Sequence, residues 1–152
     1  MVLLPGMIAG YVPYRYFGLR DARWDHLGPI RIVGLASFAA GVLLLLACVW
    51  EFARSGRGTL SPVDPPRELV VRGLYRYVRN PMYLAVSLIL LGEALASGSN
   101  SLFGYWAVFF LLANVFVIGY EEPNLRTRFG ESYERYARAV GRWIPRLPDS
   151  AF

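Results

Sequence analysis

Lysine is absent from this 152-residue chain, and all sixteen of its basic residues are arginine. Arginine binds phosphate and carboxylate groups through paired hydrogen bonds, and it also anchors helices at a membrane surface. A GC-rich genome produces the same bias. The composition therefore leaves both explanations open.

Cysteine and histidine occur once each, as Cys48 and His26. A single cysteine excludes a disulfide within the chain, and neither residue has a partner at metal-ligand spacing. The chain also lacks the glycine-rich strand–helix fingerprint of dinucleotide-binding domains. We expect no metal site and no Rossmann domain, and no nucleic-acid partner is expected either.

Charge is missing from long stretches of the chain. Residues 32–50 and 100–120 contain no charged side chain, and residues 81–99 contain a single acid. Each stretch is close to the ~20 residues that cross a ~30 Å hydrocarbon core. Residues 1–17 are a weaker fourth candidate because they contain two prolines and an arginine. The pattern predicts an all-α integral membrane protein with about four transmembrane helices, the last two forming a hairpin.

The arginines predict how these helices are oriented. Six lie in residues 54–79 and six more follow Tyr120, whereas the link at residues 96–101 has no charge. Because arginine is enriched on the cytoplasmic side of membranes, the first two regions should be cytoplasmic and the link external. We expect a multi-pass protein of the bacterial cytoplasmic membrane.

The C-terminal region has its own helical pattern. Pro123 suits a first helical turn, and Gly130 is a plausible break. An apolar, aromatic face then recurs at helical spacing through Tyr133, Tyr136, Ala137 and Val140. We expect a C-terminal helix that lies at the cytoplasmic interface or caps the bundle.

The sequence R-N-P at residues 79–81 predicts the start of a membrane helix. Asn80 is a favoured N-cap, and Pro81 suits the first helical position. A helix start flanked by interfacial arginine and tyrosine explains part of the pattern. It does not explain why Tyr75, Arg79 and Tyr83 gather at one point. A helix N-terminus also attracts anions, so the segment could seat a carboxylate or phosphate.

Glu121 and Glu122 follow the last apolar stretch on the same predicted side. They could be two solvated acids at a helix end. Acids are unfavourable at a helix C-terminus, however, so the pair favours a partner, either a nearby arginine or a cationic ligand.

These two motifs carry a family resemblance. The first reads R-N-P-M-Y at residues 79–83, and the second begins E-E at residues 121–122. The second continues through Leu125, Phe129, Gly130, Tyr133, Tyr136, Arg142 and Pro145. Over residues 32–145 the sequence resembles the isoprenylcysteine carboxyl methyltransferase family and its bacterial relatives, which are similar to membrane phospholipid methyltransferases.

The resemblance implies a single methyltransferase domain over residues 1–152 that uses S-adenosylmethionine and acts on a lipophilic or membrane-embedded acceptor. It also implies a site that faces the cytoplasm. The cofactor-binding positions that it implies are Leu69, Val70, Tyr75, Asn80, Pro81, Met82, Tyr83 and Glu121. Glu122 is then a candidate to deprotonate an amine acceptor.

Two departures from the family pattern leave the acceptor open. Asn80 stands where many relatives have histidine, as in the phospholipid N-methyltransferase branch. Val117 stands where the carboxyl methyltransferases have an arginine that holds the substrate carboxylate, and Arg128 could substitute for it. The acceptor is therefore a carboxylate or an amine, with a phospholipid N-methyltransferase as one alternative. A non-catalytic four-span protein for binding or assembly is the alternative of another class.

Overall fold

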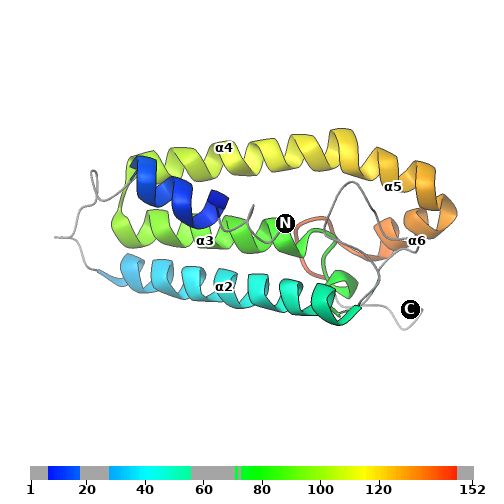
Figure 1. The fold of residues 1–152 in the computed structure, drawn as a ribbon, viewed down its shortest axis with the longest axis horizontal. Helices are drawn as coiled ribbons and strands as arrows, with labels where there is room; N and C mark the ends of the chain where they lie inside the picture. The colour runs from blue at the N-terminus through cyan, green and yellow to red at the C-terminus, as the bar shows by residue number, and fades with distance from the viewer. Residues whose placement is uncertain (1–6, 18–27, 56–70, 72, 147–152) are drawn as a thin grey trace. The chain divides into compact units, whose positions relative to one another are not determined.

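The computed structural model describes residues 7–17, 28–55, 71 and 73–146. The regular structure of these residues is helical, and an isolated parallel bridge joins Val78 to Gly141. The predicted all-α class is therefore confirmed. In chain order (Figure 1) the elements are η1 (Met7–Tyr11), η2 (Pro13–Phe17), α2 (Pro29–Ser55), η4 (Gly73–Arg76), α3 (Pro81–Ser97), α4 (Asn100–Phe116), η5 (Val117–Glu121), α5 (Glu122–Phe129) and α6 (Glu131–Ala139).

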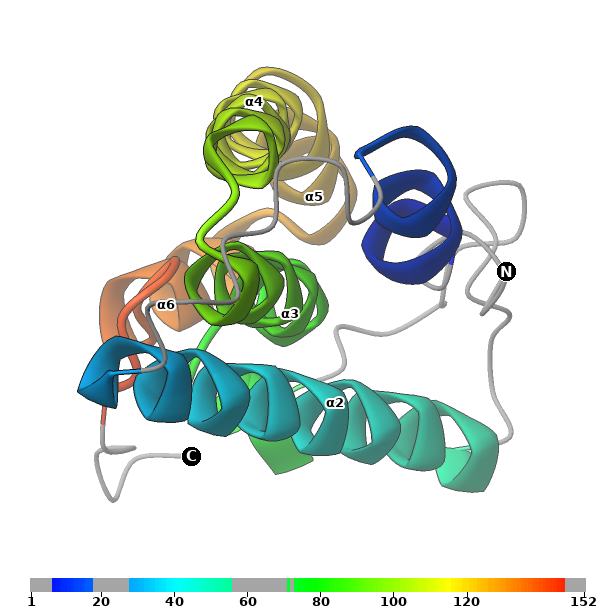
Figure 2. The same ribbon diagram turned by 90° about the vertical axis from the view of Figure 1, so that its left-hand side faces the viewer.

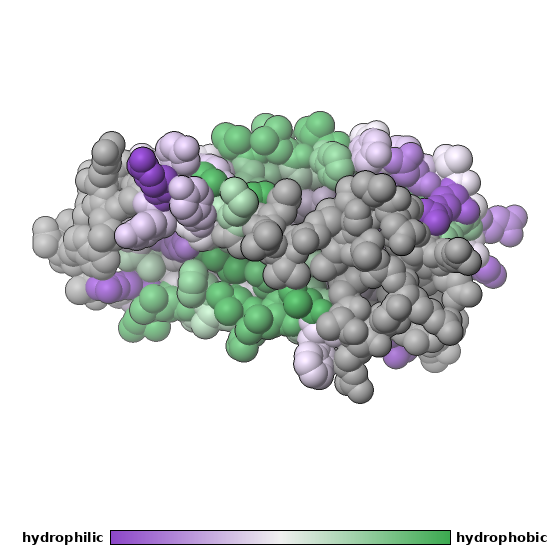
Figure 3. Space-filling model, in the orientation of Figure 1, coloured by the Kyte–Doolittle hydropathy of each residue, from purple (hydrophilic) through white to green (hydrophobic). Residues whose placement is uncertain are grey.

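Two helices within the described residues are long and apolar enough to cross a membrane. One is α2 over Pro29–Glu51, and the other is the run of α4, η5 and α5 over Asn100–Phe129. The outward surfaces of α2 and α4 are apolar in the space-filling view (Figure 3). On α4 the exposed apolar side chains include Val108, Leu111, Leu112 and Val115. Such surfaces suit a lipid environment.

The expected number of four spans is not confirmed. The third apolar helix, α3, has 17 residues, which at ~1.5 Å per residue reach only about 25 Å of a ~30 Å core. The N-terminal candidate is described only over residues 7–17, where η1, Val12 and η2 form a helical run too short to count as a span. The described part of the chain thus holds two candidate spans and one shorter apolar helix.

The chain forms two compact units. Unit 1 comprises Met1–Leu46 and Met82–Leu112, and unit 2 comprises Ala47–Pro81 and Ala113–Phe152. The boundaries fall inside α2 and α4 and at the first residue of α3. The two units therefore share helices and are not separated by a linker. The single domain expected over residues 1–152 stays a prediction.

Within unit 1, α3 lies between α2 and α4 (Figures 1 and 2). The contact between α2 and α3 is close because glycines lie in it. A Cβ atom added to Gly92 would come within 2.5 Å of the backbone nitrogen of Phe38. One added to Gly41 would come within 2.8 Å of the carbonyl oxygen of Ala85. Small residues let helix backbones approach in this way.

Polar side chains in unit 1 form hydrogen bonds between its elements. The indole Nε1 of Trp106 on α4 donates to Ser87 on α3 at 2.9 Å. The hydroxyl of Tyr105 donates to the carbonyl of Ile8 in η1 at 3.1 Å. Apolar packing accompanies these bonds, with Leu90 at its buried centre.

The predicted hairpin between the last two apolar helices is confirmed. α3 ends at Ser97 and α4 begins at Asn100, with Gly98 at a positive φ of 63° between them. The hydroxyl of the buried Ser99 accepts a hydrogen bond from the backbone N–H of Leu102 at 3.3 Å. Ser99 therefore caps the N-terminus of α4.

In unit 2, the expected new helix at Pro123 is corrected to a continuation. The helix passes through η5, where the N–H of Glu122 donates to the carbonyl of Val117. Proline has no N–H to donate, so it normally interrupts a helix in its interior. Here Pro123 is the second residue after the wider π-helical turn of η5, in which the regular hydrogen-bond pattern has already changed.

The predicted aromatic face of the last helix is confirmed. α6 begins after Gly130, whose φ is 50°. Tyr133 and Tyr136 are 2% and 4% exposed, so the helix is held by its aromatic face. The partly buried residues packed against this face are Val71, Leu125, Phe129, Ala137 and Ala139.

Candidate functional site

The segment that carries R-N-P is paired with the C-terminal segment of unit 2. The N–H of Arg79 donates to the carbonyl of Gly141 at 2.9 Å, and the N–H of Arg146 donates to the carbonyl of Tyr77 at 2.9 Å. The side-chain amide of Asn80 donates to the carbonyl of Arg142 at 3.3 Å. Two segments more than sixty residues apart therefore hold each other in place.

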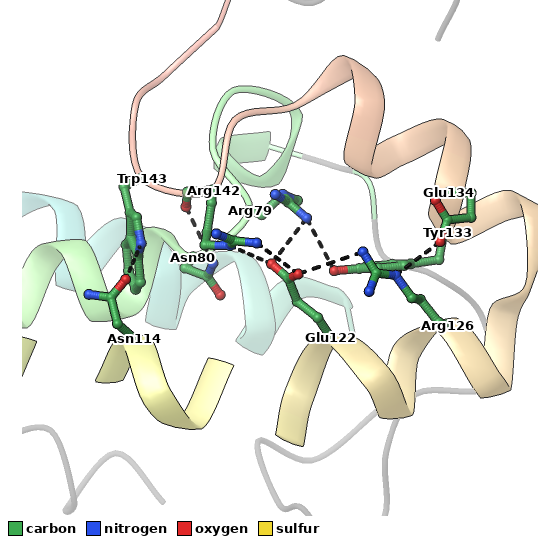
Figure 4. A network of polar contacts seen from close by, with 9 residues as sticks. All are labelled: Arg79, Asn80, Asn114, Glu122, Arg126, Tyr133, Glu134, Arg142 and Trp143. Atoms are coloured by element: carbon green, nitrogen blue, oxygen red, sulfur yellow. Dashed lines mark hydrogen bonds and ion pairs between the residues drawn. The ribbon is translucent and has the colours of Figure 1, made fainter. Parts of the chain in front are cut away.

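The carboxylate of Glu122 lies at the centre of a polar network (Figure 4). Arg142 donates from Nε to Oε1 at 2.6 Å and from Nη2 to Oε2 at 3.0 Å. Arg79 approaches the same Oε1 with its Nη1 at 3.2 Å. The side chain of Glu122 is 5% exposed, and a carboxylate at this depth requires such partners.

Tyr133 and Arg126 extend the network. The hydroxyl of Tyr133 accepts a hydrogen bond from Nη1 of Arg79 at 3.3 Å. Nη2 of Arg126 lies 4.0 Å from Glu122, while its Nε pairs with Glu134 at 2.9 Å. Arg126 is half exposed, so its ion pairs contribute less than the pair of Arg142 with Glu122.

Two pKa shifts follow from these contacts. The hydrogen bond to Glu122 raises the pKa of the Arg142 guanidinium. Burial, followed by the charge of Glu122, raises the pKa of the Tyr133 phenol. Both groups therefore stay protonated at neutral pH, and the arginine keeps its charge while the phenol stays neutral.

Tyr136 holds the segment just before R-N-P. Its hydroxyl donates to the carbonyl of Tyr75 at 2.8 Å. Burial raises the pKa of the Tyr136 phenol, which therefore stays a donor. The C-terminal segment makes a further bond, from the indole Nε1 of Trp143 to Oδ1 of Asn114 at 2.9 Å.

The predicted helix start is confirmed, since α3 begins at Pro81. Pro81 is almost fully buried. The side-chain amide of Asn80 bonds to Arg142 and thereby joins the two motifs that the sequence placed apart. Met82 and Tyr83 follow in the first turn of α3.

The other predicted site residues are distributed differently. Glu121 is the partly buried residue at the end of η5, next to Glu122. Arg128 is exposed on α5, with its guanidinium 5.5 Å from the ring centre of Phe129, whereas the arginines that contact Glu122 are Arg79, Arg126 and Arg142. Leu69 and Val70 lie outside the described residues.

The partners of Glu122 were not identified from the sequence. The contact of Arg126 with Glu122 could have been predicted from the sequence, because residues four apart lie on the same face of a helix. Arg79 and Arg142 belong to the two motifs, but their contacts with Glu122 depend on how the chain folds. The unfavourable position of the acid pair indicated that a partner should exist, and for Glu122 that partner is arginine.

Comparison with known proteins identifies the family of this chain. The family model described as phospholipid methyltransferase matches residues 30–132, which is more than half of the chain. The chain therefore belongs to the phospholipid methyltransferase family, a family of membrane methyltransferases. An uncharacterized protein of Haemophilus influenzae is 40% identical over 63 residues, which cover 41% of this chain and all of the relative. No solved structure matches the chain.

Proposed function

We propose that this protein transfers a methyl group from S-adenosylmethionine to a lipophilic acceptor in the membrane. One observation carries the proposal. In a chain of the phospholipid methyltransferase family, Arg142 bonds to Glu122 of one motif through its side chain and to Asn80 of the other through its carbonyl. These contacts hold the two motifs together, and we propose that the cofactor binds where they meet.

The residues of unit 2 fit the charges of this cofactor. When bound, S-adenosylmethionine supplies an electrophilic methyl group on a sulfonium. Glu121 stands at the position that the family pattern gives to the cofactor, and we assign its carboxylate to the cofactor's amino group or ribose hydroxyls. The partly buried ring of Tyr75 would contact the adenine or the sulfonium. Asn80 and Pro81 would present the start of α3 to the cofactor's carboxylate.

The remaining cofactor positions stay predictions from the sequence. Met82 and Tyr83 continue the turn that Pro81 begins, and Leu69 and Val70 would contribute backbone contacts. The aligned approach of the acceptor to the methyl group is what such a site must provide, since positioning supplies much of the rate of a displacement reaction.

We favour an amine acceptor on a phospholipid over a carboxylate acceptor. Asn80 and Val117 depart from the carboxyl methyltransferase pattern. The family model that matches the chain is the one described as phospholipid methyltransferase. An amine must lose a proton before or during transfer. Glu122 was the predicted helper for that step. Glu122 would have to exchange an arginine partner to accept a proton, so water is the simpler proton acceptor. A carboxylate acceptor would need no base, and Arg128 stays the predicted contact for it.

Binding of the cofactor tests the proposal. Purified protein in detergent should bind S-adenosylmethionine in calorimetry, and Glu121→Gln should weaken that binding about tenfold or more, because a charge-assisted contact is lost. Glu131→Gln, at an exposed position on α6, is the matched control and should bind as the unchanged protein does. A folded protein that binds no cofactor would support the non-catalytic alternative.

A further inference from the structure

Within the part of the chain that the structure describes, two arginines make direct contact with the single carboxylate of Glu122. These are Arg79 and Arg142, so two cations meet one anion at this contact. The neighbouring pair of Arg126 and Glu134 is neutral by itself and does not change the sum. The side chains of Arg79 and Arg142 are 12% and 33% exposed, so water screens this excess only in part.

The two arginines also have hydrogen-bond donors to spare. A guanidinium has five N–H donors. Arg142 uses its Nε and Nη2 on Glu122, and no described residue accepts from its Nη1. Arg79 uses Nη1 on Glu122 and Tyr133, while its Nε is buried and has no partner among the described residues. Unused donors and unbalanced positive charge together favour an oxyanion as ligand.

The position along the chain indicates which oxyanion meets these arginines. Glu122 follows directly after the apolar run of α4 and η5. In a membrane helix, the point at which an apolar run gives way to charged residues lies near the headgroups. The oxyanion that every phospholipid carries at that level is its phosphate.

We propose that Arg79 and Arg142 form an oxyanion site for the phosphate of a phospholipid headgroup. The choice of a lipid phosphate over other oxyanions rests on the function proposed above. Glu122 has two effects in this site. It fixes the orientation of both guanidinium groups, and it reduces their net charge to one. In this proposal the two arginines contact the phosphate, and other residues contact the rest of the headgroup.

Direct binding tests this site without any methyl transfer. The probe is a short-chain phosphatidylethanolamine below its micelle concentration, titrated by calorimetry into the full chain in neutral detergent. We expect Arg142→Gln to weaken binding about tenfold. Arg138→Gln, at an exposed position on α6, is the control and should leave the affinity unchanged. Equal losses in both variants would overturn the site, because they would indicate non-specific attraction to basic residues.

Glu122→Gln separates this site from a merely structural role for the network. Glutamine keeps an oxygen that can accept from the arginines and orient them, but it removes the negative charge. The net charge of the arginine–residue 122 contact rises from one to two, so binding of the phospholipid should become tighter. If the arginines only support the fold, Glu122→Gln and Arg142→Gln should both weaken binding, and that result would overturn the proposal. Unchanged protein gives a test that needs no variant, because the phospholipid should raise its melting temperature.

Two further probes identify the source of the oxyanion. A lipid with a neutral carbamate in place of the phosphate should bind at least tenfold more weakly than the phospholipid. Equal binding of the two lipids contradicts a phosphate site. Inorganic phosphate should compete only weakly, and a site that binds inorganic phosphate but no phospholipid contradicts the headgroup assignment.

A cofactor titration distinguishes this inference from the proposed function. In Arg142→Gln the affinity for the phospholipid should fall by a larger factor than the affinity for S-adenosylmethionine, because the main-chain carbonyl of residue 142 can still accept the hydrogen bond from Asn80. If Arg142→Gln lost cofactor binding and kept phospholipid binding, the arginines would be assigned to the cofactor, and the headgroup site would be overturned. Failure of the unchanged protein to bind cofactor contradicts the proposed function alone, since phospholipid binding is measured separately.

Discussion

Arg142 holds the buried carboxylate of Glu122 through two hydrogen bonds of 2.6 and 3.0 Å. The backbone carbonyl of Arg142 meanwhile accepts a hydrogen bond from Asn80. A residue from the C-terminal segment therefore connects two motifs that lie about forty positions apart in the sequence. The consequences for stability and function can be measured.

The ion pair of Arg142 and Glu122 should be coupled energetically. Arg142→Met should lower the free energy of unfolding by about 2 kcal/mol, because it leaves a buried carboxylate with one close arginine fewer. The double variant with Glu122→Met should lose less than the sum of the two single changes. Thermal unfolding in detergent measures this cycle, and strictly additive losses would contradict the coupling.

The close approach of α2 and α3 depends on Gly92. Gly92→Ala places a methyl group against the backbone of Phe38 and should lower stability by about 1–3 kcal/mol through overpacking. Gly104 on α4 is the matched control, since a Cβ atom there would meet nothing within 4 Å. Gly104→Ala should be neutral or slightly stabilising, because alanine favours helix. Equal melting temperatures for the two variants would refute this close contact.

Tyr136 should support the segment before R-N-P. Tyr136→Phe removes the hydroxyl that bonds to the carbonyl of Tyr75 and should cost about 1 kcal/mol of stability. If Tyr75 contributes to the cofactor site, the same variant should also weaken binding of S-adenosylmethionine. The exposed Ser132 gives a control on the same helix, and Ser132→Ala should change neither quantity. Stability and cofactor binding that both remain unchanged in Tyr136→Phe would show that the bond has no effect.

The orientation in the membrane can be tested by cysteine labelling. Ser99 lies in the predicted external turn but is fully buried, so the exposed neighbour Asn100 is the better position. A membrane-impermeant maleimide should label Asn100→Cys in intact cells, and it should label Ser132→Cys only after permeabilisation. The native Cys48 is buried and should give little background. The reverse pattern would invert the predicted topology.

Local patterns predicted local features well. Asn80 is favoured at an N-cap and Pro81 at the first helical position, and α3 begins there. The spacing of Tyr133, Tyr136 and Val140 defines one face of a helix, and that face is buried. These predictions succeeded because the interactions that cause them lie within a few residues of each other.

The remaining features depend on contacts between distant segments. The bridge of Val78 with Gly141 and the contact of Arg142 with Glu122 leave no periodic signal in the sequence. The count of four spans was not confirmed because composition alone does not fix where a helix ends. α3 stops at Ser97, where the hairpin turn begins, and it is shorter than the apolar run suggested.

The most direct test of the central claim is transfer of a labelled methyl group from S-adenosylmethionine to total membrane lipid, with the product identified by mass. The account predicts label in a lipid product that is one methyl group heavier than its precursor. Incorporation should fall with Glu121→Gln and persist with Glu131→Gln. A folded protein that transfers no label to lipid, or transfers it equally well in Glu121→Gln, would contradict the account.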